Sequence, residues 1–355
     1  MSETAHPDGP PGWWVYHGTG QPLAGGIGLM DMLPPAPPWR QFDGGPLPEA
    51  EPVPEDARET DRRLGVAHRL IARQVDPHEV EMVNAALYLR RPLLVTGRPG
   101  SGKSSLAYRI ARELRLGRVL RWPIGSRTTV KSGLYGYDAI GRAQTAGAWQ
   151  SAVGDRTGAP AEPPIGEFVR LGPLGTAFLP RRLPRVVLID ELDKSEADLP
   201  NDLLSLFEDG EFDIPELVRM RRRTPSVEVF TADPDGMAEI VGGRVRCHAF
   251  PVVVITSNGE RDFPPAFLRR CLRYETKEPN AEQLAAIVAG HALVGSESSR
   301  LIDEFVSRSA AAGSLPADKL LDAVFLATSG AYRPDDASWP RLLDALWRQL
   351  NSLAH

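Results

Sequence analysis

The chain has 355 residues, with 41 lysines and arginines against 46 aspartates and glutamates, a formal net charge of −5. Its 42% hydrophobic and 25% charged content is typical of a globular protein. The acidic balance excludes a general attraction to nucleic acid, so any such contact would be local. A chain of this length predicts a core of about 200 residues with smaller attachments.

Targeting signals and cysteine sites are not evident in the sequence. No run of about 18 apolar residues occurs, and residues 1–8 lack the basic and apolar regions of a signal peptide. We therefore expect a cytoplasmic protein without membrane insertion. The two cysteines, Cys247 and Cys271, are too few and too isolated for a zinc site or a disulfide framework, so we expect buried filling residues.

Residues 1–61 are dense in proline, glycine and acidic residues, which predicts an extended or disordered segment. Aromatic residues interrupt it at 13–16 and at Trp39, after a proline run. Two interpretations are open. The segment packs on its own domain, or it binds a partner through polyproline or aromatic contacts.

Residues 97–104 read Gly-Arg-Pro-Gly-Ser-Gly-Lys-Ser and match the phosphate-binding pattern G-x-x-x-x-G-K-[ST] at every position. Glycines allow the backbone N–H groups to face a phosphate, Lys103 can reach the β- and γ-phosphates, and the Ser104 hydroxyl can ligate Mg²⁺. A strand-like run at 92–96 and a helical pattern at 105–114 flank the loop. The pattern predicts a nucleoside triphosphate bound by Gly97, Pro99, Gly100, Ser101, Gly102, Lys103, Ser104 and Ser105.

Further strands are predicted at 119–124, 186–189 and 252–255. The last two are continuous apolar runs rich in β-branched residues, as in strands buried on both faces of a parallel sheet. Strands alternating with helices predict a doubly wound α/β domain over residues 62–278, with a surface insertion at 141–165. A second, all-α domain over 279–355 is predicted from helical patterns at 281–293, 299–311, 317–328 and 338–353.

Asp190 and Glu191 follow the strand at 186–189, at the sheet edge where ligands bind in open α/β folds. We expect Asp190 to hold Mg²⁺, directly or through water, and Glu191 to orient and deprotonate the attacking water. The alternative is an acidic strand end that caps the next helix. Asn258 ends the strand at 252–255 and can donate to the γ-phosphate or fix the water beside Glu191.

Arg269 and Arg270 lie farther along the chain. A guanidinium here could stabilise charge on the transferring phosphate, as an arginine finger supplied by a neighbouring subunit. A solvated or salt-bridged basic turn is the alternative.

In the order of these motifs the chain resembles an AAA+ ATPase, and within that class the MoxR family. The resemblance covers about residues 65–350 and includes Walker A at 97–104, Walker B at Asp190 and Glu191, sensor 1 at Asn258 and the stretch 263–270. It implies a P-loop core whose parallel sheet lies between helices, a small all-α lid, ATP and Mg²⁺. It also implies a hexameric ring and a protein partner with a von Willebrand factor A domain.

The same resemblance makes Arg270 the first candidate for the finger and Arg269 the second. Two residues compete for the sensor 2 position, Arg333 and Arg341. We prefer Arg341, because Pro340 before it suits the first turn of a helix. The N-terminal segment resembles extensions of MoxR-like proteins in bacterial ternary conflict systems.

The leading hypothesis is Mg²⁺-dependent ATP hydrolysis coupled to remodelling or activation of a protein partner. A nucleotide-gated scaffold, in which hydrolysis acts as a timer, needs the same site and stays open. A nucleic-acid motor is disfavoured by the acidic charge.

Overall fold

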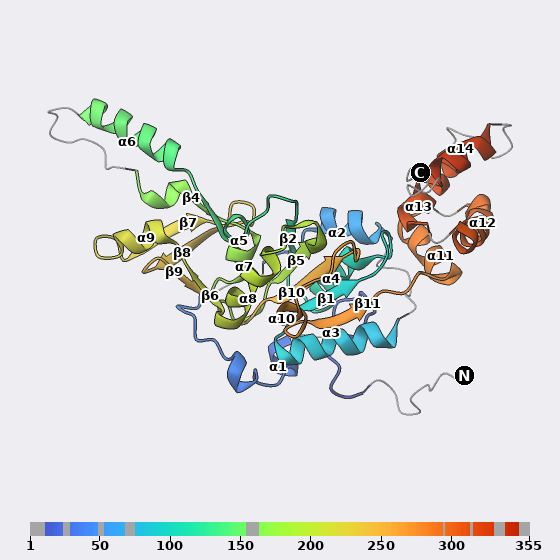
Figure 1. Ribbon diagram of the computed structural model, residues 1–355, viewed down its shortest axis with the longest axis horizontal. Helices are drawn as coiled ribbons and strands as arrows, with labels where there is room; N and C mark the ends of the chain where they lie inside the picture. Colours follow the sequence, from blue (N-terminus) through green and yellow to red (C-terminus); the bar gives the residue numbers. More distant parts are fainter. Residues whose placement is uncertain are drawn as a thin grey trace.

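The centre of the computed structural model is a parallel sheet with the strand order β11–β1–β10–β5–β2 (Figure 1). Every neighbouring pair in it is parallel, which confirms the predicted sheet. Its strands are β1 (Leu93–Thr96), β2 (Leu120–Pro123), β5 (Val186–Asp190), β10 (Val252–Ser257) and β11 (Leu272–Glu275). The structure describes residues 11–23, 29–48, 53–67, 75–153, 163–293, 295–312, 315–329 and 338–347.

Helices cover both faces of this sheet, because successive strand residues point to opposite sides. Leu93 and Val95 face α3 (Pro77–Leu89) and α4 (Lys103–Glu113) in one apolar cluster. Leu94 points to the opposite face and lies in a second apolar cluster, together with residues of the three helices that cover that face. The double burial explains why β5 and β10 read as continuous apolar runs. The helices on this second face are α7 (Pro173–Ala177), α8 (Leu199–Asp209) and α10 (Pro265–Leu268).

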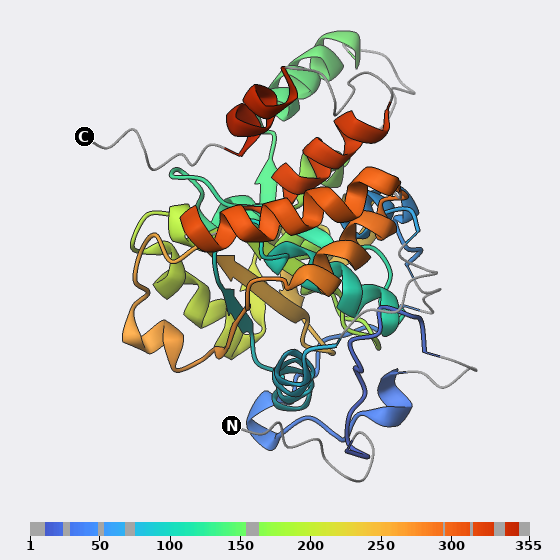
Figure 2. The same ribbon diagram turned by 90° about the vertical axis from the view of Figure 1, so that its right-hand side faces the viewer.

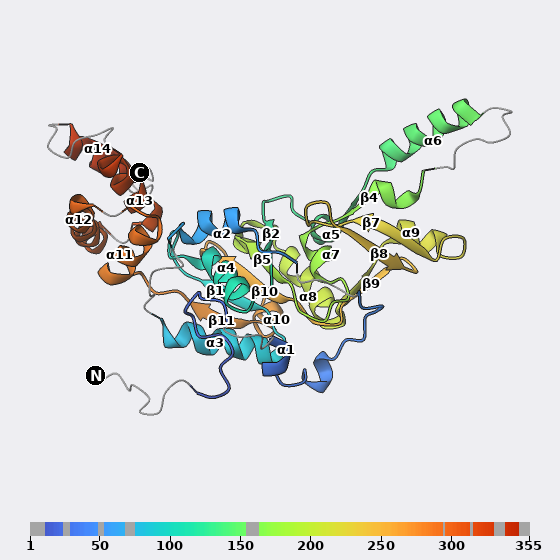
Figure 3. The same cartoon turned by 180° about the vertical axis from the view of Figure 1, so that it is seen from behind.

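A smaller sheet with the order β3–β4–β7–β8 lies beside the core, and α6 (Ala139–Val153) projects from it (Figures 1 and 3). The predicted surface insertion at 141–165 therefore contains most of a helix, while residues 154–162 lie outside the described residues. The other elements here are β3 (Tyr135–Tyr137), β4 (Val169–Leu171), β6 (Glu211–Asp213), β7 (Ser226–Phe230), β8 (Met237–Val241), β9 (Arg244–Arg246), α5 (Val130–Leu134), η2 (Ile165–Phe168) and α9 (Pro215–Met220).

The C-terminal helices pack around an apolar cluster of their own and form the predicted helical lid. Figure 2 shows them in front of the sheet. They are α11 (Ala281–Gly290), α12 (Ser296–Ala312), α13 (Ala317–Thr328) and α14 (Trp339–Leu346). The helix predicted at 338–353 begins as expected, and residues 348–355 lie outside the described residues. Within the described helices, none is long and apolar enough to cross a membrane.

The N-terminal segment contains α1 (Leu29–Met32) and η1 (Pro38–Arg40), and α2 (Ala57–Leu64) crosses its predicted end at residue 61. Val15 and Tyr16 are fully buried against α3 and α4, and α1 lies beside α3 (Figure 3). The oxygen of the Asn84 side chain accepts hydrogen bonds from both backbone N–H groups, at 2.8 and 3.0 Å. At these residues the segment packs on its own domain, whereas Trp39 is 73% exposed.

Cys247 and Cys271 are both buried, as expected for filling residues. Burial raises the pKa of each thiol to about 12. At neutral pH both are therefore protonated and poor nucleophiles.

Candidate functional site

The glycine loop after β1 leads directly into α4, at the edge of the sheet where β5 and β10 also end. Gly97, Gly100 and Gly102 have φ values of 144°, 78° and 82°, which residues other than glycine rarely adopt. A Cβ at Gly97 would lie 2.1 Å from the Thr276 hydroxyl oxygen. The backbone of the loop therefore requires glycine at these positions, and the N-terminus of α4 faces the loop as in anion-binding sites.

Lys103 lies at the start of α4 and is buried. Its ammonium donates to the carbonyl oxygens of Gly97 and Arg98, both at 2.7 Å. Burial lowers the pKa of Lys103, and the acidic residues after β5 partly offset this shift. The lysine thus closes the loop on itself, with its positive charge at the loop's centre.

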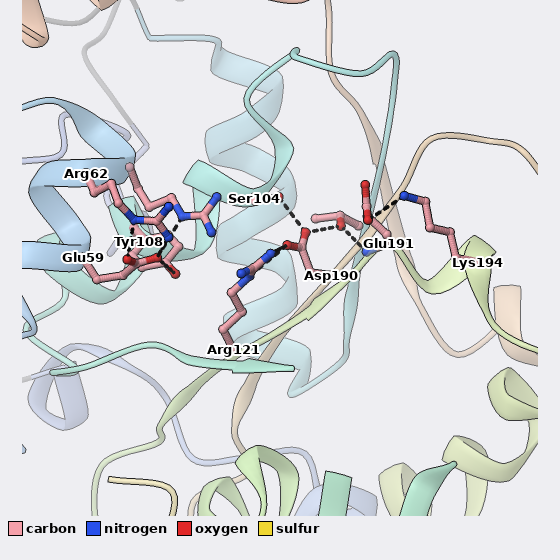
Figure 4. A network of polar contacts seen from close by, with 10 residues as sticks. Glu59, Arg62, Ser104, Tyr108, Arg121, Asp190, Glu191 and Lys194 are labelled. Atoms are coloured by element: carbon pink, nitrogen blue, oxygen red, sulfur yellow. Dashed lines mark hydrogen bonds and ion pairs between the residues drawn. The ribbon is translucent and has the colours of Figure 1, made fainter. Parts of the chain in front are cut away.

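The structure brings Asp190 and Ser104 together, although 86 residues separate them. Asp190 Oδ1 accepts hydrogen bonds from the hydroxyls of Ser104 at 2.7 Å and Thr256 at 2.9 Å. Its Oδ2 accepts from Nε and Nη2 of Arg121, at 3.0 and 2.7 Å (Figure 4). Burial alone would raise the pKa of Asp190, but the hydrogen bonds from Ser104, Arg121 and Thr256 outweigh it and lower the pKa.

Glu191 follows Asp190 with a φ of 64°, in the left-handed region that non-glycine residues seldom adopt. Its backbone N–H donates to the Thr256 hydroxyl at 2.8 Å, which fixes the turn at the strand end. The carboxylate is half-exposed and accepts from Lys194 at 2.8 Å (Figure 4). This strained turn points the Glu191 side chain away from the buried strand, and such strain is common at functional sites.

Asn258 lies directly after β10, and its position is fixed by Asp193 in the turn η3 (Leu192–Lys194). Asp193 Oδ2 accepts from the backbone N–H groups of Asn258 at 2.8 Å and Glu260 at 3.1 Å. Asp193 Oδ1 is buried and has no hydrogen-bond partner among the described residues. One carboxylate thus couples the acidic turn to the end of the next strand, which places Asn258 beside the site.

Arg269 and Arg270 follow α10, on the side of the core that carries α8. The Arg270 guanidinium pairs with Glu208 of α8, and both side chains are partly exposed. Arg91 donates to the carbonyl oxygen of Arg269 at 3.5 Å. Within one chain Arg270 is therefore held in the salt-bridged turn that the sequence left as an alternative.

The lid touches the glycine loop through the start of α13. A Cβ at Gly100 would lie 2.5 Å from the Cα atom of Pro316, so the two backbones are in close contact. Arg98 also pairs with Glu278, just before the lid, at 2.9 Å. Of the two sensor 2 candidates, Arg341 is exposed in the first turn of α14 and Arg333 lies outside the described residues.

Sequence reasoning assigned no role to Arg121 or Asp193. Arg121 had a weak signal, since it is the charged residue between the buried Leu120 and Trp122. Nothing local to these residues indicates their partners, which lie 65 to 69 residues away in the chain.

Residues 92–271 match the family model described as an AAA domain of the dynein-related subfamily. Among solved structures, the chain is similar to NtrX from Brucella abortus in complex with ADP, with a TM-score of 0.38 and 12% identity. That similarity covers 83% of this chain and 60% of the NtrX chain, less than two thirds of its length. No curated protein matches the chain in sequence.

Proposed function

Because the chain belongs to the dynein-related subfamily of AAA domains, we propose that it is an Mg²⁺-dependent ATPase that remodels or activates a protein partner. The observation that carries the proposal is the 2.7 Å hydrogen bond between Ser104 and Asp190. It joins the residue after the phosphate-loop lysine to the acid at the end of β5. Phosphoryl transfer requires these two groups side by side, because both serve the same metal–phosphate unit.

The donor set fits magnesium. The Ser104 hydroxyl and the Asp190 carboxylate are oxygen ligands of the kind Mg²⁺ prefers, and Mg²⁺ is usually held by one or two such groups together with substrate phosphates. These two residues would hold the ion. When bound, it would neutralise negative charge on the phosphates.

The chain's own residues bind the phosphates, activate the water and stabilise the developing charge. The loop N–H groups and Lys103 bind the phosphates, which spreads the charge that develops during transfer. Glu191 orients the attacking water and accepts its proton, and Asn258 fixes that water or the γ-phosphate from the neighbouring strand. Arg270 leaves Glu208 and completes the site of an adjacent copy, with Arg269 as the second candidate. Activity by this route requires a ring, which we propose is hexameric.

The finer assignment follows the resemblance of the motifs. We propose a MoxR-type protein in which residues 1–61, 62–278 and 279–355 are N-terminal segment, nucleotide-binding domain and lid, with Arg341 as sensor 2. The client is a protein with a von Willebrand factor A domain, within a conflict system of the cytoplasm. The contact between Gly100 and Pro316 supports a coupling between ATP hydrolysis and movement of the lid, because a change at the phosphates would act directly on α13.

One observation favours the alternative of a nucleotide-gated switch. Glu191 is paired with Lys194 at 2.8 Å, and this ion pair holds the carboxylate that would have to orient the attacking water. Slow hydrolysis would then act as a timer for partner release.

Replacing Lys103 by alanine should weaken ATP affinity by about 10- to 100-fold, because charge-assisted hydrogen bonds contribute about 1.5–3 kcal/mol. Calorimetric titration of the full chain with ATP and Mg²⁺ measures this change. Lys131→Ala is the matched control, since Lys131 lies in α5 with an exposed side chain. Equal affinity in the wild type and Lys103→Ala would contradict the proposed function.

A further inference from the structure

The carboxylate of Asp190 divides its two oxygens between different kinds of partner. Oδ1 faces the hydroxyls of Ser104 and Thr256, which are neutral. Oδ2 accepts two hydrogen bonds from Arg121, which converge on this one oxygen and are strengthened by the charges of both groups. The acid proposed to hold the metal thus already carries a cation of the chain itself.

Arg121 reaches Asp190 from the neighbouring strand. β2 pairs with β5 in parallel register, so that Pro123 lies opposite Asp190 and Arg121 is two residues earlier. Leu120 and Trp122 are buried, whereas the Arg121 side chain lies on the other face and remains 39% exposed. Packing therefore fixes the strand but leaves the guanidinium of Arg121 free to change partner.

The space beside Arg121 offers a second position for the guanidinium. A cavity of about 320 Å³ lies between β2 and α2 and is lined by Arg121, Glu59 and Tyr108 among others. Tyr108 donates to Glu59 Oε1 at 3.2 Å, and Arg62 and Arg63 also donate to Glu59. Figure 4 shows Arg121 between Asp190 on one side and the group of Glu59, Arg62 and Tyr108 on the other. Glu59, across the cavity, is thus already paired with two arginines, and the room for the Arg121 guanidinium is the cavity itself.

Given the proposed function, on which this step rests, we propose that Arg121 is a positioning residue that competes with the divalent cation for Asp190. The guanidinium orients the carboxylate toward Ser104, and it neutralises the charge that would attract a metal. Two cations at one carboxylate repel each other, so tight metal binding requires Arg121 to leave. The guanidinium then turns into the cavity between β2 and α2.

The test is the Mg²⁺ requirement of nucleotide binding, measured on the full chain with a fluorescent ADP analogue. In Arg121→Met, which keeps the length and removes the charge, the Mg²⁺ concentration for half-maximal enhancement of affinity should fall about tenfold. Affinity without Mg²⁺ should stay within about twofold. Arg121→Lys, which keeps the charge without the paired hydrogen bonds, should lie between Arg121→Met and the wild type.

Arg118→Met is the matched control, because Arg118 lines the same cavity but pairs with Asp56 at 3.6 Å. Its Mg²⁺ requirement should equal that of the wild type. An unchanged or increased Mg²⁺ requirement in Arg121→Met overturns the competition. A loss of ADP affinity that is equally large with and without Mg²⁺ also overturns it, because such a loss indicates a merely structural role. If Arg121→Met does not fold, Arg121→Gln carries the same test.

Failure of the nucleotide site and failure of the competition would give different results. If the wild type binds ADP no better than Lys103→Ala, the proposed nucleotide site is wrong and the competition falls with it. If the wild type binds ADP with a clear Mg²⁺ enhancement, and Arg121→Met does not lower the Mg²⁺ concentration at which this enhancement is half-maximal, only the competition is wrong.

Discussion

Replacement of Glu191 by glutamine should lower ATP turnover by about 10²–10⁴-fold, the usual contribution of a general base. Glutamine has the same size and keeps the backbone N–H that donates to Thr256, so the turn survives. The amide cannot accept the proton of the attacking water. ATP affinity should therefore stay within about threefold of the wild type, since Lys103 and Ser104 are untouched.

Phosphate release under saturating ATP measures the rate, and calorimetric titration measures the affinity. Glu196→Gln is the control, because Glu196 is an exposed acid in the same segment. Turnover in Glu191→Gln equal to that of Glu196→Gln would show that another group activates the water.

The slow variant also tests assembly and partner. Held in its ATP-bound form, Glu191→Gln should elute as a ring, and a tagged copy should retain its client from a lysate. A client that binds Glu191→Gln as well as it binds the hydrolysing wild type would favour the switch over the remodeller. Elution only as a monomer in ATP would count against the finger role of Arg270.

Tyr16→Ala should reduce the free energy of unfolding by about 3–5 kcal/mol, the cost of emptying a large buried aromatic site. Tyr16 is fully buried in the cluster of α3 and α4, and its hydroxyl donates to Glu79 at 3.1 Å. Alanine would leave a cavity and remove this bond. Urea unfolding followed by circular dichroism measures the loss.

Trp39→Ala is the natural comparison, because it removes an even larger aromatic side chain from the same segment. Trp39 is 73% exposed, so its removal should change stability by less than about 0.5 kcal/mol. Equal small losses in both variants would mean that residues 15–16 do not pack as described. A large loss for Tyr16→Ala alone would establish the segment as part of the core.

The packing of this segment reaches the nucleotide site through α4. Glu113, near the end of α4, accepts hydrogen bonds from the backbone N–H groups of His17 and Gly20. Its side chain is almost fully buried, and these hydrogen bonds compensate the cost of burying the carboxylate. The helix that begins at Lys103 is thus held at its far end by residues the sequence indicated as extended or disordered.

Much of the architecture was predictable because the signals are local. The β-branched runs at 186–189 and 252–255 predicted buried parallel strands, and β5 and β10 are confirmed as such strands. The apolar spacing after the glycine loop predicted α4, and the helical patterns beyond 279 predicted the lid. In each case one face or one backbone requirement is encoded within a dozen residues.

In the candidate site too, the features with local signals were predictable and the long-range contacts were not. By itself, the sequence determined the glycine loop, the strand-end acids Asp190 and Glu191, and the polar strand end at Asn258, because each depends on neighbouring residues and backbone geometry. Only the tertiary structure decided that Arg121 pairs with Asp190, that Asp193 holds Asn258, and that Tyr16 is buried. These contacts join residues 65 to 69 positions apart. Periodicity identifies the face that a side chain occupies, whereas strand order and register select its partner.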